Sequence, residues 1–272
     1  MSVAAIETRR SMLLTGWCLL AAIVLALVIA VGVSVGELAI PLQNVFYAIS
    51  NRTGLTAEPL NRIYESVIWD FRLSRALVAA CCGAGLAICG VVLQSLLKNA
   101  LAEPYVLGVS ASAQQARDVM FWLLGSFSGV RWPEFQLVIV VVLTGLAVCL
   151  WYARALDAFT FGDDAAASLG IAVPRVRLIL FTTAALITAT IVSMAGSIGF
   201  VGLVVPHVMR FFFGPLHRTL LIASALAGAI LMVLADIASR LLIAPQSLPV
   251  GVVTALVGVP FFAVIIYRSR NK

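Results

Sequence analysis

The stretch that decides the fold is GSIGFVGLVVPHVMRFFFGPLHR, residues 196–218. It contains both histidines of the chain, His207 and His217, together with Pro206 and Pro215. The segments on either side of it are apolar enough to cross a lipid bilayer, so the chain must leave one crossing here and begin another. Proline removes a backbone donor, and glycine lets backbones approach closely. We therefore predict a short or broken helix at the membrane boundary.

The composition is that of an integral membrane protein. Hydrophobic residues make up 62% of the 272 residues and charged residues 11%, whereas soluble domains carry roughly 25% charged residues. We predict an all-α, polytopic membrane helix bundle that forms one transmembrane domain over residues 1–272. The formal net charge of +6 does not indicate a nucleic-acid partner. The basic residues stand at the ends of apolar runs, where they orient membrane proteins.

The residue types that most often bind metals do not indicate a metal site. All five cysteines fall inside apolar runs: Cys18, Cys81, Cys82, Cys89 and Cys149. This setting favours small buried side chains over a disulfide or metal site. The two histidines have no Asp, Glu or Cys close to them in the sequence, which favours a structural role over metal binding. The sequence contains no GxxxxGK[ST] phosphate loop and no nucleophile–base pair, so we expect neither an enzyme nor ATP hydrolysis by this chain alone.

Six apolar runs are predicted to cross the membrane, at residues 12–36, 76–97, 135–152, 178–199, 219–242 and 250–267. Residues 196–218 are predicted to return the chain to the inside between the fourth and fifth of these runs, with Arg210 and Arg218 marking the inside. The first run follows Arg9 and Arg10 and is too long for the apolar core of a signal peptide. Residues 37–75 carry charges of both signs and are expected on the outer side. The distribution of arginine and lysine places both termini in the cytoplasm.

The charge pattern also requires a crossing that is not obvious in the sequence. Lys98 places the chain inside after the second run, and Arg154 places it inside again after only one more clear run. The candidate for the outward crossing between them, residues 105–130, includes Arg117 and Asp118. An Asp or Arg at a helix centre costs roughly 2.5–3.5 kcal/mol. This candidate is therefore a poor span.

Four segments together resemble the permease subunits of ATP-driven importers for ferric siderophores, haem and cobalamin. They are residues 72–110, 161–177, 196–218 and 224–262, and they cover most of the chain. The resemblance implies ten spanning helices in a complete family member. In this chain the motif GVSASA ends at Ala113, and about three helices that follow it in the family are missing. The loss of an odd number of crossings accounts for the charge pattern.

The resemblance implies a permease subunit of the bacterial cytoplasmic (inner) membrane that imports a ferric siderophore, or haem or cobalamin. It implies no cofactor bound by this chain. The implied partners are an ATP-binding cassette subunit that uses ATP, an extracytoplasmic substrate-binding protein, a second copy of the permease and the lipid bilayer. Residues 120–130 loosely resemble the siderophore branch. The alternative is a secondary transporter or channel driven by an ion gradient, for which Asp236 is the main intramembrane candidate.

The resemblance also assigns residues that receive the binding protein. Arg72, Arg75 and Arg240 match arginines that dock its acidic residues. The alternative for these arginines is to extend to the membrane interface as ordinary helix-end residues do. Asp236 also lies one helical turn before Arg240 and could pair with it. The family usually has a glutamate before a later Leu-Pro-x-Gly motif, and Ser247 stands there instead.

A second set of residues is assigned to coupling and to helix packing. Segment 161–177 matches the coupling helices that rest in a groove of the ATPase, although a simple surface turn is the alternative. The coupling residues are Asp163, Asp164, Ser168, Leu169, Gly170 and Ile171. We expect a short helix there that stops at glycine. The residues assigned to the pathway and to close packing are Gly83, Gly90, Gly199, Gly202 and Pro206.

Overall fold

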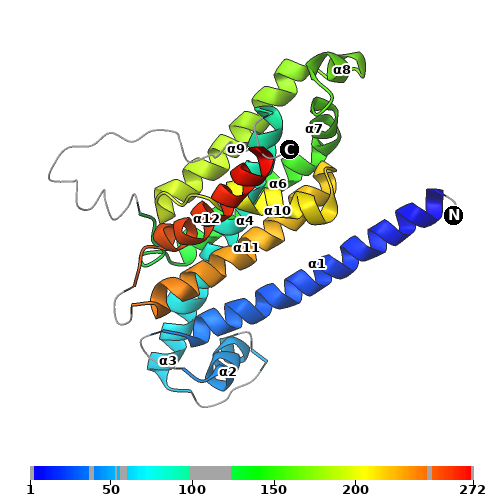
Figure 1. The fold of residues 1–272 in the computed structure, drawn as a ribbon. Coiled ribbons are helices and arrows are strands. Elements are labelled where there is room, and N and C mark those ends of the chain that lie inside the picture. Colours follow the sequence, from blue (N-terminus) through cyan, green and yellow to red (C-terminus); the bar gives the residue numbers. More distant parts are fainter. Residues whose placement is uncertain are drawn as a thin grey trace, which may run out of the picture.

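The computed structural model is a bundle of helices (Figure 1). It describes residues 3–36, 40–52, 54–55, 60–98, 124–243 and 247–270. The long helices are α1 (Val3–Ser34), α4 (Ser74–Leu96), α6 (Trp132–Trp151), α9 (Val173–Ala195), α11 (His217–Leu241) and α12 (Val250–Arg270). The shorter elements are α2 (Leu42–Arg52), α3 (Arg62–Ser66), the π-helix η1 (Val67–Leu73), α7 (Ala153–Phe159), α8 (Asp163–Ser168) and α10 (Val201–Phe213).

Helix α4 is the centre of the bundle. It packs against α1, α6, α9, α10 and α11, and most of its side chains are buried. Gly83 lies against Gly228 of α11, and Gly90 lies against Gly202 of α10. A Cβ atom at Gly83 or Gly90 would collide with the backbone carbonyl of its partner. Glycine therefore lets α10 and α11 approach α4 backbone to backbone.

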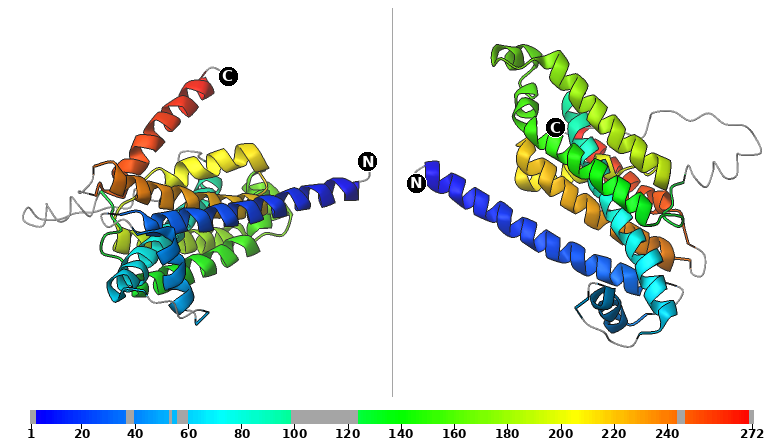
Figure 2. Two further views of the ribbon diagram at one scale, coloured as in Figure 1. Left: turned by 90° about the horizontal axis from the view of Figure 1, so that it is seen from below. Right: turned by 180° about the vertical axis from the view of Figure 1, so that it is seen from behind.

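Helices α1 and α12 lie at the edge of the bundle. Figure 1 shows α1 diverging from the other helices toward its N-terminus, and Figure 2 shows α12 standing away from them. The ring of Trp17 in α1 still meets that of Phe213 in α10, with 4.7 Å between centroids. Most of the apolar surface of α1 is therefore left for lipid or for other protein.

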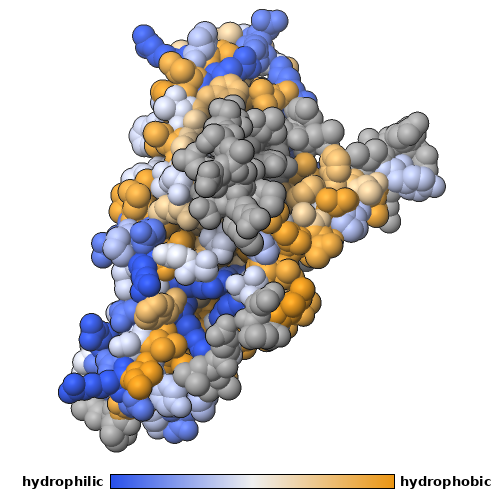
Figure 3. Space-filling model, turned by 90° about the vertical axis from the view of Figure 1, so that its left-hand side faces the viewer, coloured by the Kyte–Doolittle hydropathy of each residue, from blue (hydrophilic) through white to orange (hydrophobic). Residues whose placement is uncertain are grey.

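Five helical segments of the described residues are long and apolar enough to cross a membrane. They are Met12–Ser34, Arg62–Leu96, Trp132–Trp151, Val173–Ala195 and His217–Leu241. Helix α10 and the stretch Val250–Val264 of α12 are shorter apolar helices. On the face in Figure 3, hydrophilic side chains gather at the top and in the lower part, and hydrophobic ones dominate the right-hand middle. This distribution suits a bundle surrounded by lipid at mid-height.

The bundle has two ends, which we call the α8 end and the η1 end; η1 directly follows α3, which Figure 1 labels. Lys98, after α4, lies at the α8 end, with its Nζ 3.5 Å from Asp163 Oδ1. At the η1 end, the backbone N–H of Ser126 donates to the carbonyl of Ala195, where α9 ends. Lys98 and Ser126 therefore lie at opposite ends of the bundle. The poor candidate span 105–130 lies mostly outside the described residues.

Two crossings begin well before the residue that the sequence predicts. The second is predicted from residue 76, but α3, η1 and α4 form one segment of 35 residues from Arg62. Arg72 and Arg75, which suggest a loop in the sequence, make buried contacts inside the bundle. Helix α9 begins before residue 178, because Pro174 lies in its first turn, where a missing N–H costs nothing.

Residues 196–218 form the short helix predicted for them. The chain leaves α9 at Gly196 (φ 73°) and turns at Phe200 (φ 68°), both in the left-handed region. Helix α10 then runs for 13 residues and ends at Gly214 (φ 80°). Because its first turn lies beside Gly90, more than halfway along α4, helix α10 crosses only part of the bundle.

Candidate functional site

A buried carboxylate joins two helices at the η1 end. Asp236 of α11 has no exposed surface. Its Oδ1 accepts a hydrogen bond from Arg75 Nε of α4 at 2.8 Å and lies 2.8 Å from Arg75 Nη2. Its Oδ2 lies 3.0 Å from Arg240 Nη2, one turn further along α11. The two guanidinium groups compensate the carboxylate charge that burial would otherwise make costly.

The same cluster caps the C-terminus of α1. The last carbonyls of a helix have no partner within the helix, and cations are favourable beside them. No basic residue of α1 stands in its own last turn. Arg72 Nη1 donates to the carbonyls of Val33 (3.0 Å) and Ser34 (2.9 Å), and Arg240 donates to those of Gly32 (2.9 Å) and Val35 (2.6 Å). Two arginines from other helices thus cap α1.

The structure brings the three predicted docking arginines together, with their side chains turned inward. The side chain of Arg75 is 17% exposed and that of Arg240 is 11% exposed. The contacts assign Arg72, Arg75 and Arg240 a role in joining α1, α4 and α11, while docking stays a prediction. Asp236, the candidate carboxylate of an ion-driven transporter, is held by two arginines.

A polar clamp holds α10 against α4. Pro206 has no backbone N–H, so the carbonyl of Gly202, four residues earlier, lacks its helical donor. Gln94 of α4 is 4% exposed, and its Nε2 donates to the carbonyls of Gly202 (3.0 Å) and Leu203 (3.3 Å). Its Oε1 lies 3.5 Å from Arg210 Nη1. The clamp supplies a donor in place of the one that Pro206 lacks, and α10 continues as one helix.

Gln94 is not among the predicted site residues, although the sequence contains a signal for it. Gln94 is an amide within the apolar second half of α4, and it follows Gly90 by four residues. Residues four apart share one face of a helix. The glycine that admits α10 and the amide that bonds α10 therefore face the same neighbour.

The predicted coupling segment forms the tip of the α8 end. Gly162 (φ 111°) and Gly170 (φ 83°) bracket α8 in the left-handed region. Asp163 pairs with Arg177 of α9 at 3.0 Å, which fixes α8 to the start of that helix. Phe161 and Leu169 flank α8 and are 82% and 72% exposed. The tip is a short braced helix with two large apolar side chains open to the surroundings.

The predicted coupling residues differ in exposure. Asp164, Ser168, Leu169 and Gly170 are exposed, and both aspartates lie in the first turn of α8, where the helix dipole favours them. Ile171 instead packs against the main hydrophobic core and is turned inward. It follows the left-handed Gly170, which redirects the chain toward α9.

One contact joins this tip to the corner between α10 and α11. Asp157 Oδ1 of α7 accepts a hydrogen bond from the backbone N–H of His217 at 2.8 Å, and it lies 2.7 Å from His217 Nδ1. His217 is 2% exposed, which is consistent with the predicted structural role. The sequence places Asp157 in the inside loop, but it gives no sign of this partner 60 residues away.

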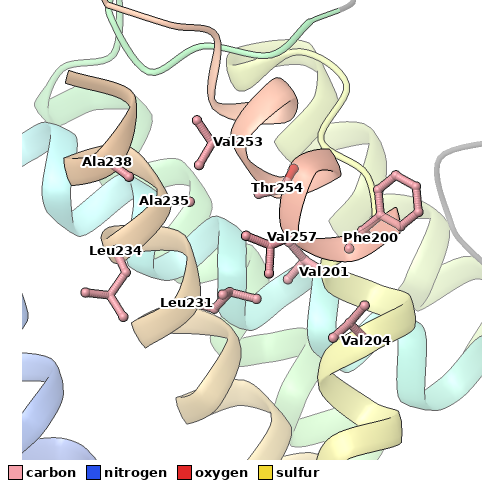
Figure 4. Close-up of a pocket in the computed structure, with 11 residues that line it drawn as sticks. Phe200, Val201, Val204, Leu231, Leu234, Ala235, Ala238, Val253, Thr254 and Val257 are labelled. Atoms are coloured by element: carbon pink, nitrogen blue, oxygen red, sulfur yellow. The ribbon is translucent and has the colours of Figure 1, made fainter. Parts of the chain in front are cut away.

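An apolar cavity lies between α10, α11 and α12 (Figure 4). Its volume is about 190 Å³. The lining side chains include Phe200, Val204, Leu231, Leu234 and Val257. This surface offers apolar contact and no charged group that would orient a metal chelate. Within the described ranges, no group of three or more His, Cys, Asp or Glu side chains is placed to hold a metal ion.

Comparison with known proteins identifies the family. Residues 22–116 and 111–268 match the FecCD transport family. The iron(3+)-hydroxamate import system permease protein FhuB of Bacillus subtilis is 29% identical, with 95% of this chain and 83% of that protein covered. The cobalamin import system permease protein BtuC of Halobacterium salinarum is 31% identical, with 89% and 82% covered.

A solved structure shows the same fold. It is described as an inward-facing conformation of a metal-chelate type ABC transporter, and it superposes with a TM-score of 0.79. The sequences are 23% identical, and the match covers 95% of this chain and 99% of that one. This likeness supports the helix arrangement alone.

The alignments also bear on the missing helices. They extend over 331 and 314 positions, more than the 272 residues of this chain, so both relatives contain positions with no counterpart here. The two family matches meet at residues 111–116, where the resemblance places the missing segment. With most of its length matched, this chain belongs to the FecCD transport family and is a multi-pass membrane permease subunit of an ABC importer, not an enzyme.

Proposed function

We propose that this chain is the permease through which a ferric siderophore crosses the bacterial cytoplasmic membrane, with haem and cobalamin as the other candidate substrates. The names of its relatives support this class of cargo, because they include an iron(3+)-hydroxamate permease and a cobalamin permease. An outer binding protein delivers the substrate, and a separate ATP-binding cassette subunit supplies the energy.

The exposed apolar tip carries the proposal for the ATPase. Phe161 and Leu169 are exposed on either side of α8, where Asp163 pairs with Lys98 and Arg177. Large apolar side chains on a polar end of a membrane protein mark a contact surface. In the proposed assembly the tip inserts these two side chains into a groove of the ATPase.

The proposed orientation follows from the charges at the α8 end. The basic residues there are Lys98, Arg154, Arg175, Arg177, Arg210 and Arg218. Short loops rich in arginine and lysine remain in the cytoplasm. The α8 end is therefore the cytoplasmic one in the proposal, and both termini lie on that side.

The η1 end receives the binding protein in this proposal. Arg75 and Arg240 share one partner carboxylate, Asp236, so these three side chains together carry an excess of positive charge. An acidic surface of the binding protein would be attracted to this excess within a screening length of about 8 Å. Any such protein meets arginines that already hold α1, α4 and α11 together.

A second copy of the permease completes the proposed transporter, with the pathway at the two-fold axis. The centre of the single bundle is filled by α4, and the cavity lined by α12 is small and apolar. Crosslinking in native membranes should yield a dimer. A population of monomers alone would contradict this part of the proposal.

Uptake in cells tests the substrate. A bacterial strain that lacks its own siderophore, haem and cobalamin permeases should import iron-labelled hydroxamate when it receives this chain with its ATPase and binding protein. Labelled haem and cobalamin serve as the competing substrates. If the strain imports cobalamin or haem but not the iron-labelled hydroxamate, that compound is the substrate in place of the siderophore. If it imports none of the three, the proposed function is wrong.

A further inference from the structure

Helix α7 forms the base of the exposed tip and packs inside the bundle. Most of its side chains are buried, and it contacts α4, α6 and α11. Its contacts with α4 and α11 are mainly apolar, and apolar contacts have no preferred direction. The hydrogen bonds of Asp157 to His217 are directional, and they fix α7 to one point of α11.

That point is the corner where α10 ends and α11 begins. His217 is the first residue of α11, and its backbone N–H is one of the donors that a helix start leaves unpaired. The carboxylate of Asp157 accepts from this donor, and a negative charge at a helix N-terminus is favourable. Gly214 (φ 80°) lies just before the corner and allows the angle between α10 and α11.

The imidazole of His217 strengthens the attachment. Nδ1 lies 2.7 Å from the same carboxylate oxygen, so the side chain and the backbone of one residue share one acceptor. Nε2 is buried, and the described part of the chain gives it no hydrogen-bond partner. Within the described ranges, the Asp157 carboxylate is therefore the one hydrogen-bond partner of the His217 ring.

Helix α11 connects this corner to the opposite end of the bundle. Its 25 residues begin at His217 and lead to the cluster of Asp236 and Arg240, which holds α1 and α4. A displacement of the corner along the axis of α11 therefore reaches the η1 end through one rigid element. Helix α10 shares the corner and is held at its other end by Gln94.

We propose that the Asp157–His217 contact is the joint through which movement of the α7–α8 tip is transmitted to α10 and α11. Asp157 and His217 are then positioning residues for transport, and neither touches the substrate. The inference rests on the proposed function, because it needs an ATPase that moves the tip. It adds the connection inside the permease that turns this movement into a displacement of membrane helices.

The test uses the permease assembled with its ATPase and binding protein in proteoliposomes. Asp157→Ala removes both hydrogen bonds, whereas Asp157→Asn keeps a side-chain oxygen for the backbone N–H of His217. Three quantities are measured for each variant: the amount of ATPase that copurifies, the rate of ATP hydrolysis and the rate of substrate uptake. The ratio of substrate moved to ATP hydrolysed separates coupling from a general loss of folded protein.

For Asp157→Ala we expect normal copurification, hydrolysis within about twofold of the parent, and at least a tenfold lower ratio of uptake to hydrolysis. Asp157→Asn should recover part of this ratio. His207→Asn is one control, since His207 lies in α10 and takes no part in the hydrogen bonds of Asp157, and Glu65→Ala is the carboxylate control at the η1 end. Both controls should keep the parent ratio.

Two results would overturn the proposal that the Asp157–His217 contact transmits movement. Uptake and hydrolysis that fall together in Asp157→Ala would make Asp157 a helix cap with a structural role alone. An unchanged ratio would show that movement reaches α11 by another route. If the parent chain neither binds an ATPase nor shows ATP-dependent uptake, the proposed function fails first, and the joint fails with it.

Discussion

Gln94 Nε2 of α4 donates a hydrogen bond at 3.0 Å to the carbonyl of Gly202 in α10, the carbonyl that Pro206 leaves without its helical donor. The donor missing from α10 is thus replaced by an amide from another helix. Gly90, one turn before Gln94, lies against the same carbonyl. The attachment of α10 to α4 therefore depends on one small residue and one amide on the same face.

Replacing Gln94 by leucine should destabilise the protein. The buried carbonyl of Gly202 would lose its donor, and such a loss costs roughly 1–3 kcal/mol. The measurement is the thermal unfolding of the purified protein in detergent. Pro206→Ala restores a backbone N–H in α10, so Gln94→Leu should cost less in that background. Equal costs in both backgrounds would contradict the account of the clamp.

Adding a methyl group at Gly90 should also destabilise the bundle. The new Cβ would collide with the carbonyl of Gly202, and overpacking typically costs roughly 1–3 kcal/mol. Gly16→Ala in α1 is the control, because no described atom outside its own stretch of helix lies within 4 Å of the position of its Cβ. Unfolding temperatures should fall for Gly90→Ala and stay level or rise for Gly16→Ala, since alanine is the better helix former. A similar response of the two would mean that α10 and α4 are not in backbone contact.

Removing Asp236 should be more costly than removing an exposed ion pair. Asp236→Ala leaves Arg75 and Arg240 side by side with no carboxylate between them, and breaking a buried pair costs roughly 3–5 kcal/mol. Arg52→Ala, which breaks a 3.9 Å pair with Glu65, should cost about 1 kcal/mol or less. Unfolding in detergent measures both. A mild effect of Asp236→Ala would show that Arg75 and Arg240 do not depend on this carboxylate.

An acidic residue in the tip should block assembly with the ATPase. Leu169→Asp places a charge in the proposed contact, where a desolvated ion without a partner costs several kcal/mol. Pull-down of the ATPase should fall at least tenfold, while the unfolding temperature of the permease stays unchanged. Leu55→Asp is the matched control, because Leu55 is 80% exposed at the η1 end. If the Leu169→Asp variant assembled normally with the ATPase, the tip would not be the contact surface and would only connect α7 to α9.

The local features of the chain could be predicted because they depend on neighbours in sequence. Glycine and proline at residues 196–218 predict the short α10, and Gly170 predicts the end of α8. The start of the second crossing could not be predicted, because Arg72 and Arg75 look like loop residues until their partners are known. Those partners lie in α1 and α11, 38 to 161 positions away along the chain.

The polar attachments of the site depend on such distant partners as well. Gln94 meets Gly202 across 108 positions, and Asp157 meets His217 across 60. Neither pair follows a local spacing rule, so periodicity and charge pattern cannot reveal it. The inward direction of the Ile171 side chain could not be predicted either, because it results from the left-handed turn at Gly170 and from packing against the core.

The most direct test of the central claim is the energy source for uptake. The chain is reconstituted with its ATPase in proteoliposomes, with the binding protein and iron-labelled siderophore on the side of the η1 end and nucleotide on the side of the α8 end. We expect uptake that requires hydrolysable ATP and persists when ionophores collapse all ion gradients. Uptake that proceeds without ATP and stops with the ionophores would contradict the account and favour a secondary transporter.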